Sequence, residues 1–131
     1  EYLAIVAKSD SLVRVFRRFQ SKDDPEATVK EEIECLKKAG ELLGASAKIS
    51  KNYSNTSYSY MYIPDLVAPR KASLTSCLDS IFTYWKELAQ DSYRLYQSGI
   101  TEEKDYAVRF INYALDAKPD RNLEELRKKL Q

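Results

Sequence analysis

The sequence predicts a mainly α-helical protein: an irregular bundle of four to five helices with a β-hairpin inserted between the second and third helices. Two observations predict the helices. Three glycines and four prolines are few for 131 residues, and apolar residues recur every three or four positions over most of the chain. The hairpin is predicted by alternating residues over about 47–63. With 44% hydrophobic residues, a chain of this length can bury one core, so we expect a single domain over residues 1–131.

The first two expected helices occupy the N-terminal third of the chain. Residues 2–8 are mostly apolar and predict a helix, and a further helical stretch follows to about residue 20. Asp24 and Pro25 form a typical helix start, an acidic N-cap followed by proline. We expect this second helix to end at Gly44, because glycine favours the residue that follows a helix.

The expected hairpin consists of two strands that flank a turn-forming run of Ser, Asn and Thr residues. Successive side chains of a strand point to opposite faces, so Tyr58, Tyr60 and Tyr62 are expected to share one face. An isolated hairpin is only marginally stable in water. One face of this hairpin is therefore expected to pack on the helices.

The C-terminal half predicts three helices. Pro64 and Pro69 are expected to bound a short extended connector, after which a long helix covers about residues 73–98. This helix carries the most continuous apolar stripe of the chain, so we expect it to form the centre of the core. Thr101 and Asn122 are the expected N-caps of two shorter helices.

Several classes of chemistry find no support in the sequence. The chain has no histidine, the usual general acid or base near neutral pH, and no glycine-rich phosphate-binding motif. Cys35 and Cys77 are not spaced as a zinc-binding pair, so we expect buried free thiols, with a disulfide as the alternative. We expect no enzymatic activity, no cofactor and no metal. An enzyme that uses carboxylates and tyrosines is the remaining alternative.

Net charge and hydropathy limit the partners and the cellular location that we expect for this chain. The net charge is +1, from 21 basic and 20 acidic residues, whereas strong nucleic-acid binders usually carry a clear basic excess. A local basic patch can still exist, because a net value hides clustering. No apolar stretch approaches the length of a membrane span. We therefore expect a cytoplasmic protein with no membrane partner.

Basic residues in the first helix form one candidate contact surface. Arg14, Arg18 and Lys22 are each one helical turn apart if the helix continues, and Arg17 lies beside them. Such a strip can contact phosphate groups through charge. The alternative is an ordinary solvated helix face.

The expected hairpin forms a second candidate surface, where tyrosines alternate with basic residues. Aromatic rings among basic side chains can stack nucleobases or dock a protein. The alternative is that these rings cover the helical core. The residues of this surface are Tyr53, Tyr58, Tyr60 and Tyr62, flanked by Lys48, Lys51, Arg70 and Lys71.

The last predicted helix, Leu123 to Leu130, is amphipathic and carries Arg127, Lys128 and Lys129. A helix of this kind can dock on a neighbouring subunit. The alternative is that it closes its own bundle.

The order of the predicted parts points to a family. The parts are a helix with Ser11-Leu12-Val13-Arg14, a helix over 28–43, a hairpin that ends in Tyr-Met-Tyr-Ile-Pro, and a long helix with the run from Lys86 to Arg94. Over roughly residues 9–98, this order resembles the small subunit of archaeal type I-A CRISPR surveillance (Cascade) complexes. The resemblance implies a non-catalytic helical subunit that lines an RNA-guided complex and helps hold target or displaced DNA. The near-neutral charge favours a mainly structural place in such an assembly.

These observations together predict a non-catalytic accessory subunit of a larger assembly. The expected partners are protein subunits of that complex and the backbone of RNA or DNA, which would be contacted without reading the base sequence. The alternative is a protein-only interaction module, such as an adaptor, an inhibitor or an immunity-type protein, that binds its partner through the tyrosine-rich hairpin.

Overall fold

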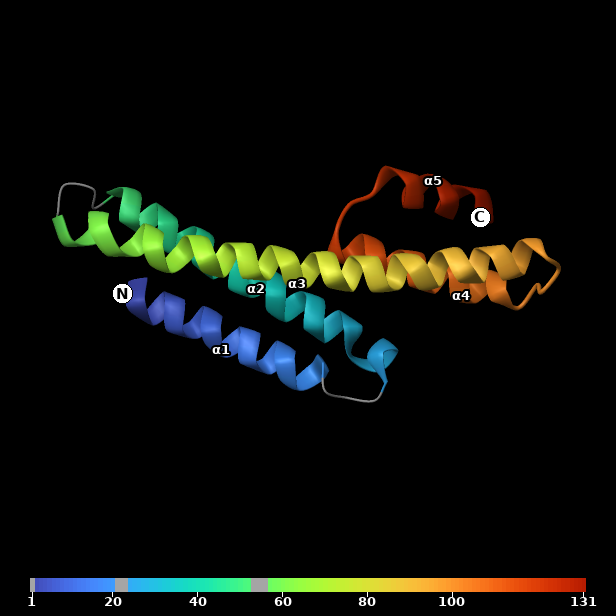
Figure 1. Cartoon of the computed structure of the whole chain (residues 1–131), viewed down its shortest axis with the longest axis horizontal. Helices are drawn as coiled ribbons and strands as arrows, with labels where there is room; N and C mark the ends of the chain where they lie inside the picture. Colours follow the sequence, from blue (N-terminus) through green and yellow to red (C-terminus); the bar gives the residue numbers. More distant parts are fainter. Residues whose placement is uncertain (1, 21–23, 53–56) are drawn as a thin grey trace. The chain divides into compact units, whose positions relative to one another are not determined.

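The computed structural model describes the backbone of residues 2–20, 24–52 and 57–131, and the side chains of residues 4–18, 24–45 and 67–131. These residues form five α-helices and no β-strand, which confirms the mainly α prediction (Figure 1). The helices are α1 (Tyr2–Gln20), α2 (Pro25–Asn52), α3 (Ser57–Gln97), α4 (Glu103–Ala117) and α5 (Arg121–Leu130).

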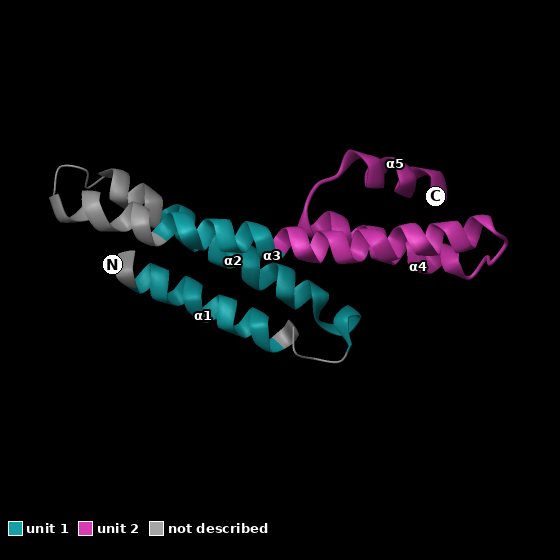
Figure 2. Ribbon diagram, viewed as in Figure 1, with its two compact units in different colours: residues 1–77 teal, residues 78–131 magenta. Residues whose placement is uncertain are grey.

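The helices belong to two compact units, residues 1–77 and residues 78–131 (Figure 2). Unit 1 contains α1, α2 and the first part of α3. Unit 2 contains the second part of α3 together with α4 and α5. One continuous helix therefore supplies side chains to both cores.

The prediction of a β-hairpin over about residues 47–63 is wrong. Residues 47–52 are the last residues of α2 and residues 57–63 are the first residues of α3; most of the predicted turn lies outside the described residues. Extending an existing helix by one residue costs less than starting a new element, so α2 continues past Gly44. The alternating stretch also lacks the Asn-Gly or Asp-Gly pair that fixes the register of a short hairpin.

The predicted connector between Pro64 and Pro69 is also helical, because both prolines lie within α3. A proline inside a helix cannot donate the backbone hydrogen bond to the carbonyl four residues earlier, and it costs about 3 kcal/mol relative to alanine. Helix α3 therefore carries a local cost in its N-terminal part. From residue 73 onwards the predicted helix is confirmed, although Ser73 lies inside the helix rather than at its cap.

Unit 1 is built on close contact between α1 and α2, which run side by side (Figure 1). Ser9 of α1 is 1% exposed, and its Oγ donates a hydrogen bond to the carbonyl oxygen of Ala39 in α2 at 3.4 Å. Small side chains at this contact allow the two backbones to approach closely. Among the described side chains of unit 1, the buried apolar ones are Val6, Phe16, Val29, Ile33, Leu36, Ala39, Leu43, Val67 and Leu74.

The start of α2 confirms the predicted cap. Asp24 Oδ1 accepts hydrogen bonds from the backbone N–H groups of Glu26 at 3.2 Å and Ala27 at 3.4 Å, and Pro25 is the first helical residue. The carboxylate satisfies two donors that have no partner within the helix.

Unit 2 begins as a helical hairpin of α3 and α4. Gly99 joins them with φ of 113°, in the region that favours glycine, so the predicted end of the long helix is confirmed. Trp85 of α3 packs on Phe110 and Tyr113 of α4, with ring centroids 5.4 and 4.8 Å apart. The buried apolar side chains of unit 2 are Ile81, Phe82, Trp85, Ala89, Ala107, Ile111, Ala114, Ala117, Leu123 and Leu130.

The caps of the last two helices differ from the prediction. Glu102, not Thr101, occupies the N-cap of α4, and its side chain makes no capping hydrogen bond. The N-cap of α5 is Asp120, not Asn122, and its Oδ1 accepts from the backbone N–H of Leu123 at 3.0 Å. Both Asp and Asn are good N-cap residues, so residue preference alone did not choose between them.

Candidate nucleic-acid interface

Three predicted contact residues lie together on the solvent side of α1. Arg14, Arg17 and Arg18 are all exposed, whereas the buried residues of this helix, such as Ser9 and Phe16, face the core of unit 1. Arg14 and Arg18 are one turn apart, and Arg17 follows Arg14 by three residues, so the three side chains are neighbours. We call these three residues the α1 arginine face. Lys22, predicted as its fourth member, lies outside the described residues.

Arg70 does not extend this surface, because it is engaged within unit 1. Its Nε and Nη2 donate to the two carboxylate oxygens of Asp10 at 2.9 and 3.0 Å. The two residues are 60 positions apart in the sequence, so this two-pronged ion pair links α3 to α1. Donating this hydrogen bond to the Asp10 carboxylate raises the pKa of Arg70. Lys71, the neighbouring predicted contact residue, is exposed.

The Asp10–Arg70 pair also determines the charge of α1. Asp10 is the one acidic residue between Tyr2 and Gln20, and the guanidinium of Arg70 neutralises it. Asp10 therefore does not offset the positive charge of the α1 arginine face, one turn further along the helix. Sequence reasoning missed this role of Arg70, because the two partners are remote in the chain.

Arg14 is held by a short chain of hydrogen bonds on the surface of α1. Its Nη2 donates to Ser11 Oγ at 3.1 Å, and Ser11 Oγ donates to the carbonyl oxygen of Ala7 at 3.1 Å. Guanidinium carries five N–H donors in a planar fork. Donors remain for an additional acceptor, and phosphate oxygens suit this fork.

The structure does not bring the remaining predicted residues together as a hairpin surface. Lys48 and Lys51 belong to α2, and Tyr58, Tyr60 and Tyr62 belong to α3. An α-helix turns 100° per residue, so position 60 falls on the opposite side of α3 from positions 58 and 62, whereas a strand would place all three on one face. The side chains of these five residues, and Tyr53 as a whole, lie outside the described residues.

Unit 2 contains an aromatic row that the sequence analysis did not single out. The row runs from Tyr84 through Trp85 and Phe110 to Tyr106, with successive ring centroids 5.1, 5.4 and 6.0 Å apart. The ring of Tyr113 also packs on Trp85, with centroids 4.8 Å apart. The two end rings, Tyr84 and Tyr106, are 48% and 45% exposed. The signal was present in the sequence, because residues 106, 110 and 113 are spaced to share one side of a helix.

The Arg109 guanidinium lies over the Tyr106 ring at 4.8 Å from its centroid, within the range of a cation–π contact. Glu102 and Asp105 lie beside the same ring in a shallow hollow of unit 2. The exposed end of the aromatic row is therefore flanked by two acids and one base. Such a mixed surface suits a protein more than a polyanion.

Within the described ranges, the cysteines and the acidic residues do not converge on a metal site. Cys35 and Cys77 are free and half-buried, rather than fully buried as predicted, and burial raises the pKa of the Cys35 thiol. Among the described residues, no three side chains of His, Cys, Asp or Glu are placed to hold a metal ion. Within the same residues, no helix combines the length and the apolar character that crossing a lipid bilayer requires.

Comparison of the chain with known protein families, with curated proteins and with solved structures finds no match in any of the three.

Proposed function

We propose that this chain is a non-catalytic accessory subunit that binds the phosphate backbone of nucleic acid through the α1 arginine face. The observation that carries the proposal is the arrangement of charge on α1. Three exposed arginines share one region of the helix, and Arg70 neutralises the one acid of that helix. A locally basic surface therefore coexists with a net charge of +1 for the whole chain.

The mechanism is electrostatic and does not read sequence. Each guanidinium that contacts a phosphate displaces counterions from the nucleic acid, so affinity falls as salt is added. The helix holds the three arginines at fixed spacing, which sets how the strand lies on the protein. Contacts of this kind position a nucleic acid and carry no base information.

A role as a subunit adds a place in an assembly and protein partners to the proposal. The resemblance to small subunits of CRISPR surveillance complexes extends it to an RNA-guided assembly in the cytoplasm, with other protein subunits as partners. One of the parts behind that resemblance, the hairpin, is replaced by helices α2 and α3. The extension therefore rests on the helical parts and on the quoted residues alone.

The experiment is a salt titration of binding to single- and double-stranded oligonucleotides. Arg14→Gln combined with Arg17→Gln is expected to weaken binding and to lower the slope of log affinity against log salt by about 1.4 for single strands, that is, about 0.7 for each lost contact. The control is Lys30→Gln with Lys37→Gln, which removes the same charge from exposed positions of α2 in the same unit. The control is expected to leave the slope unchanged.

A second variant tests the role of the ion pair. Asp10→Asn removes a negative charge from α1 together with the ion pair to Arg70, so it is expected to tighten binding and to steepen the salt dependence. Circular dichroism verifies that each variant remains helical. Absence of binding at low salt, or equal loss in the arginine and lysine double variants, would contradict the proposal.

A protein-only interaction module is the second candidate function, and one observation favours it. The exposed ends of the aromatic row, Tyr84 and Tyr106, provide large amphipathic rings, which are frequent at protein interfaces. Copurification of a protein partner without nucleic acid, lost on Tyr106→Ala and retained on Arg14→Gln, would support this candidate over the first.

A further inference from the structure

The large apolar side chains that remain exposed gather in unit 2. Among the described residues they are Tyr84, Leu95, Ile100 and Tyr106, each between 42% and 48% exposed. Tyr84 and Leu95 lie on α3, Tyr106 lies on α4, and Ile100 lies in the turn that joins the two helices. The exposed apolar surface is therefore concentrated on the α3–α4 hairpin.

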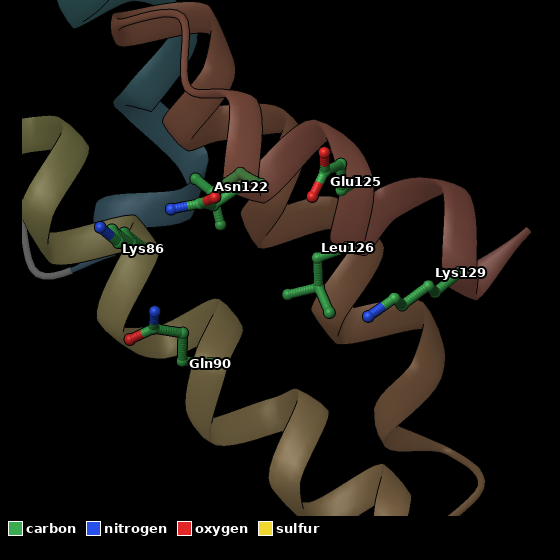
Figure 3. A pocket seen from close by; sticks show the side chains of 7 residues that line it. Lys86, Gln90, Asn122, Glu125, Leu126 and Lys129 are labelled. Atoms are coloured by element: carbon green, nitrogen blue, oxygen red, sulfur yellow. The ribbon is translucent and has the colours of Figure 1, made fainter.

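On α3 the exposed side chains belong to one stripe of the helix. Successive members are four, three and four residues apart, the spacing of one helix face; they are Tyr84, Leu88, Asp91 and Leu95. Lys86 and Gln90 each follow a member of the stripe by two residues, about 200° around the helix, and line a pocket that α3 shares with α5 (Figure 3). Helix α5 therefore lies against one side of α3, and the stripe lies on the opposite side.

The turn after α3 fixes the end of this stripe. The backbone N–H of Ile100 donates to the carbonyl oxygen of Leu95, and the N–H of Gly99 donates to that of Tyr96, both at 3.1 Å. With Gly99 at φ of 113°, these two bonds form the Schellman motif, in which residues at the positions of Leu95 and Ile100 commonly form an apolar contact. Both side chains are still more than 40% exposed, so a fixed apolar surface remains open to a partner.

The charged residues beside this face are mainly acidic. Glu87 follows Tyr84 by three residues on α3, and Glu102 and Asp105 share the shallow hollow with Tyr106. All three carboxylates are exposed, and none of them forms an ion pair within the described ranges. They are therefore available to basic groups of a partner.

The basic residues beside this face already have contacts within unit 2. Arg94 is paired with Asp91 of the stripe, and the Arg109 guanidinium lies over the Tyr106 ring. Even with both bases counted, the acids are in excess. A partner with basic residues around an apolar stripe would be complementary to this face in both charge and polarity.

We propose that this face of the α3–α4 hairpin docks a basic amphipathic helix of a partner protein. The apolar side of that helix packs along Tyr84, Leu88 and Leu95, and its Lys or Arg side chains reach Glu102 and Asp105. A helix suits this surface because the stripe is straight and extends over about 16 Å, the rise of its residues along α3.

The partner helix would lie on the hairpin opposite α5 and complete a four-helix arrangement. The proposal rests on the protein-interaction candidate described above and gives the partner a chemistry. It does not depend on the α1 arginine face, which lies in unit 1.

The experiment titrates the full chain with synthetic peptides and follows its backbone amide shifts by NMR. The probe is a peptide of leucine and lysine, about 18 residues long so that it can form a helix, with the leucines on one helix face. The comparison peptides are the same sequence with glutamate in place of lysine, and a scrambled leucine–lysine sequence. We expect the amphipathic lysine peptide to bind most tightly, with shifts centred on residues 84–95 and 100–106.

An apolar variant tests the stripe. Tyr84→Ala combined with Leu95→Ala is expected to weaken binding of the lysine peptide by at least about tenfold, because a few large side chains supply most of the affinity at such interfaces. The control is Leu126→Ala, which removes a half-buried apolar side chain from the pocket on the α5 side. The control is expected to change the affinity by less than about twofold.

A charge variant tests the acidic border. Glu102→Gln combined with Asp105→Asn is expected to weaken binding of the lysine peptide and to reduce its salt dependence. The control, Glu124→Gln with Glu125→Gln, removes the same charge from exposed positions of α5 in the same unit and is expected to leave the salt dependence unchanged. Circular dichroism verifies that each variant remains helical.

Three results would overturn the proposal. The first is equal binding of the lysine and glutamate peptides, and the second is a set of shifts centred on α5 or on unit 1. The third is a dimer of the full chain, seen by sedimentation velocity, that the Tyr84→Ala and Leu95→Ala changes abolish, since a second copy would then be the occupant.

The outcomes also separate this proposal from the functions proposed above. Lysine-peptide binding that survives Arg14→Gln with Arg17→Gln supports a docking face independent of nucleic-acid binding. A copurified protein partner that is lost on Tyr106→Ala, without binding of the lysine peptide, would support the protein-interaction candidate and overturn the basic helix.

Discussion

Glu32 illustrates how one buried charge limits the stability of unit 1. Glu32 is 8% exposed, and its Oε1 accepts one hydrogen bond from Thr28 Oγ1 at 3.1 Å. Burial raises the pKa of this carboxyl above its ordinary value of 4.5; the Thr28 bond opposes the rise and neighbouring Glu31 adds to it. Keeping the carboxylate ionised in the core therefore costs free energy.

The expected result is that Glu32→Gln stabilises the protein at pH 7. The folded state holds the Glu32 proton more tightly than the unfolded chain does. The contribution of Glu32 to the free energy of unfolding therefore falls as the pH rises from 4.5 through the raised pKa. Below pH 4.5 the carboxyl is neutral in both states, so the advantage of the variant is expected to disappear.

Urea unfolding at pH 4 and pH 7 measures this difference. The control is Glu34→Gln, because Glu34 is an exposed acid of the same helix paired with Lys38 at 2.9 Å. Its loss is expected to change the free energy of unfolding by no more than about 0.5 kcal/mol. An unchanged difference between Glu32→Gln and the native chain at the two pH values would show that Glu32 is well solvated.

Among the helical elements, two of the three glycines differ in what they do. Gly44 lies inside α2, and a Cβ built there meets nothing within 4 Å. Gly99 lies in the α3–α4 turn with φ of 113°, which side-chain-bearing residues rarely adopt. The same substitution should therefore have opposite effects at the two positions.

Gly44→Ala is expected to raise the free energy of unfolding by about 0.5–1 kcal/mol, because alanine is the better residue inside a helix. Gly99→Ala is expected to lower it by about 1 kcal/mol or more, because alanine is strained at positive φ. Thermal unfolding followed by circular dichroism measures both. If Gly44→Ala destabilised the protein, α2 would end at Gly44, as its sequence predicts.

The elements also show what the sequence could and could not predict. The spacing of Val29, Ile33 and Leu36 by four and three residues predicts one shared helix face, and all three side chains are buried in α2. The hairpin prediction over residues 47–63 is wrong because alternation of residue types is a local pattern, which does not register helix propagation from both sides. Local patterns carry no information about how far a neighbouring helix extends.

The candidate site was predictable to a similar extent. The exposed positions of Arg14, Arg17 and Arg18 followed from helical spacing alone. The ion pair between Arg70 and Asp10 did not follow from the sequence, because it requires the packing of α3 against α1. The pocket that α3 and α5 line in unit 2 was equally hidden, because its residues are remote from one another in the sequence.

At the scale of the whole molecule, the chain has two compact units with a core in each. Trp85 is the one tryptophan of the chain and is buried in unit 2. Its fluorescence therefore reports the state of unit 2, whereas circular dichroism reports the helices of both units.

Ile111→Ala removes a side chain that is 0% exposed in the core of unit 2 and is expected to cost about 2–5 kcal/mol there. Ile33→Ala is the matched change in unit 1, where Ile33 is 4% exposed. We expect Ile111→Ala to lower the denaturant midpoint of Trp85 fluorescence more than Ile33→Ala does. Equal shifts by the two variants would indicate one cooperative domain over residues 1–131.

The hydrogen bond from Ser9 to Ala39 has a consequence for the arginines that lie far from it. The side chains of two packed helices interdigitate, and a directional hydrogen bond between the helices adds a preference for one longitudinal position. The Ser9 bond thereby helps to set how far α1 is advanced along α2, and with it where the three guanidinium groups lie relative to the rest of unit 1. Alanine in place of Ser9 would leave the surface charges intact while removing this directional contact.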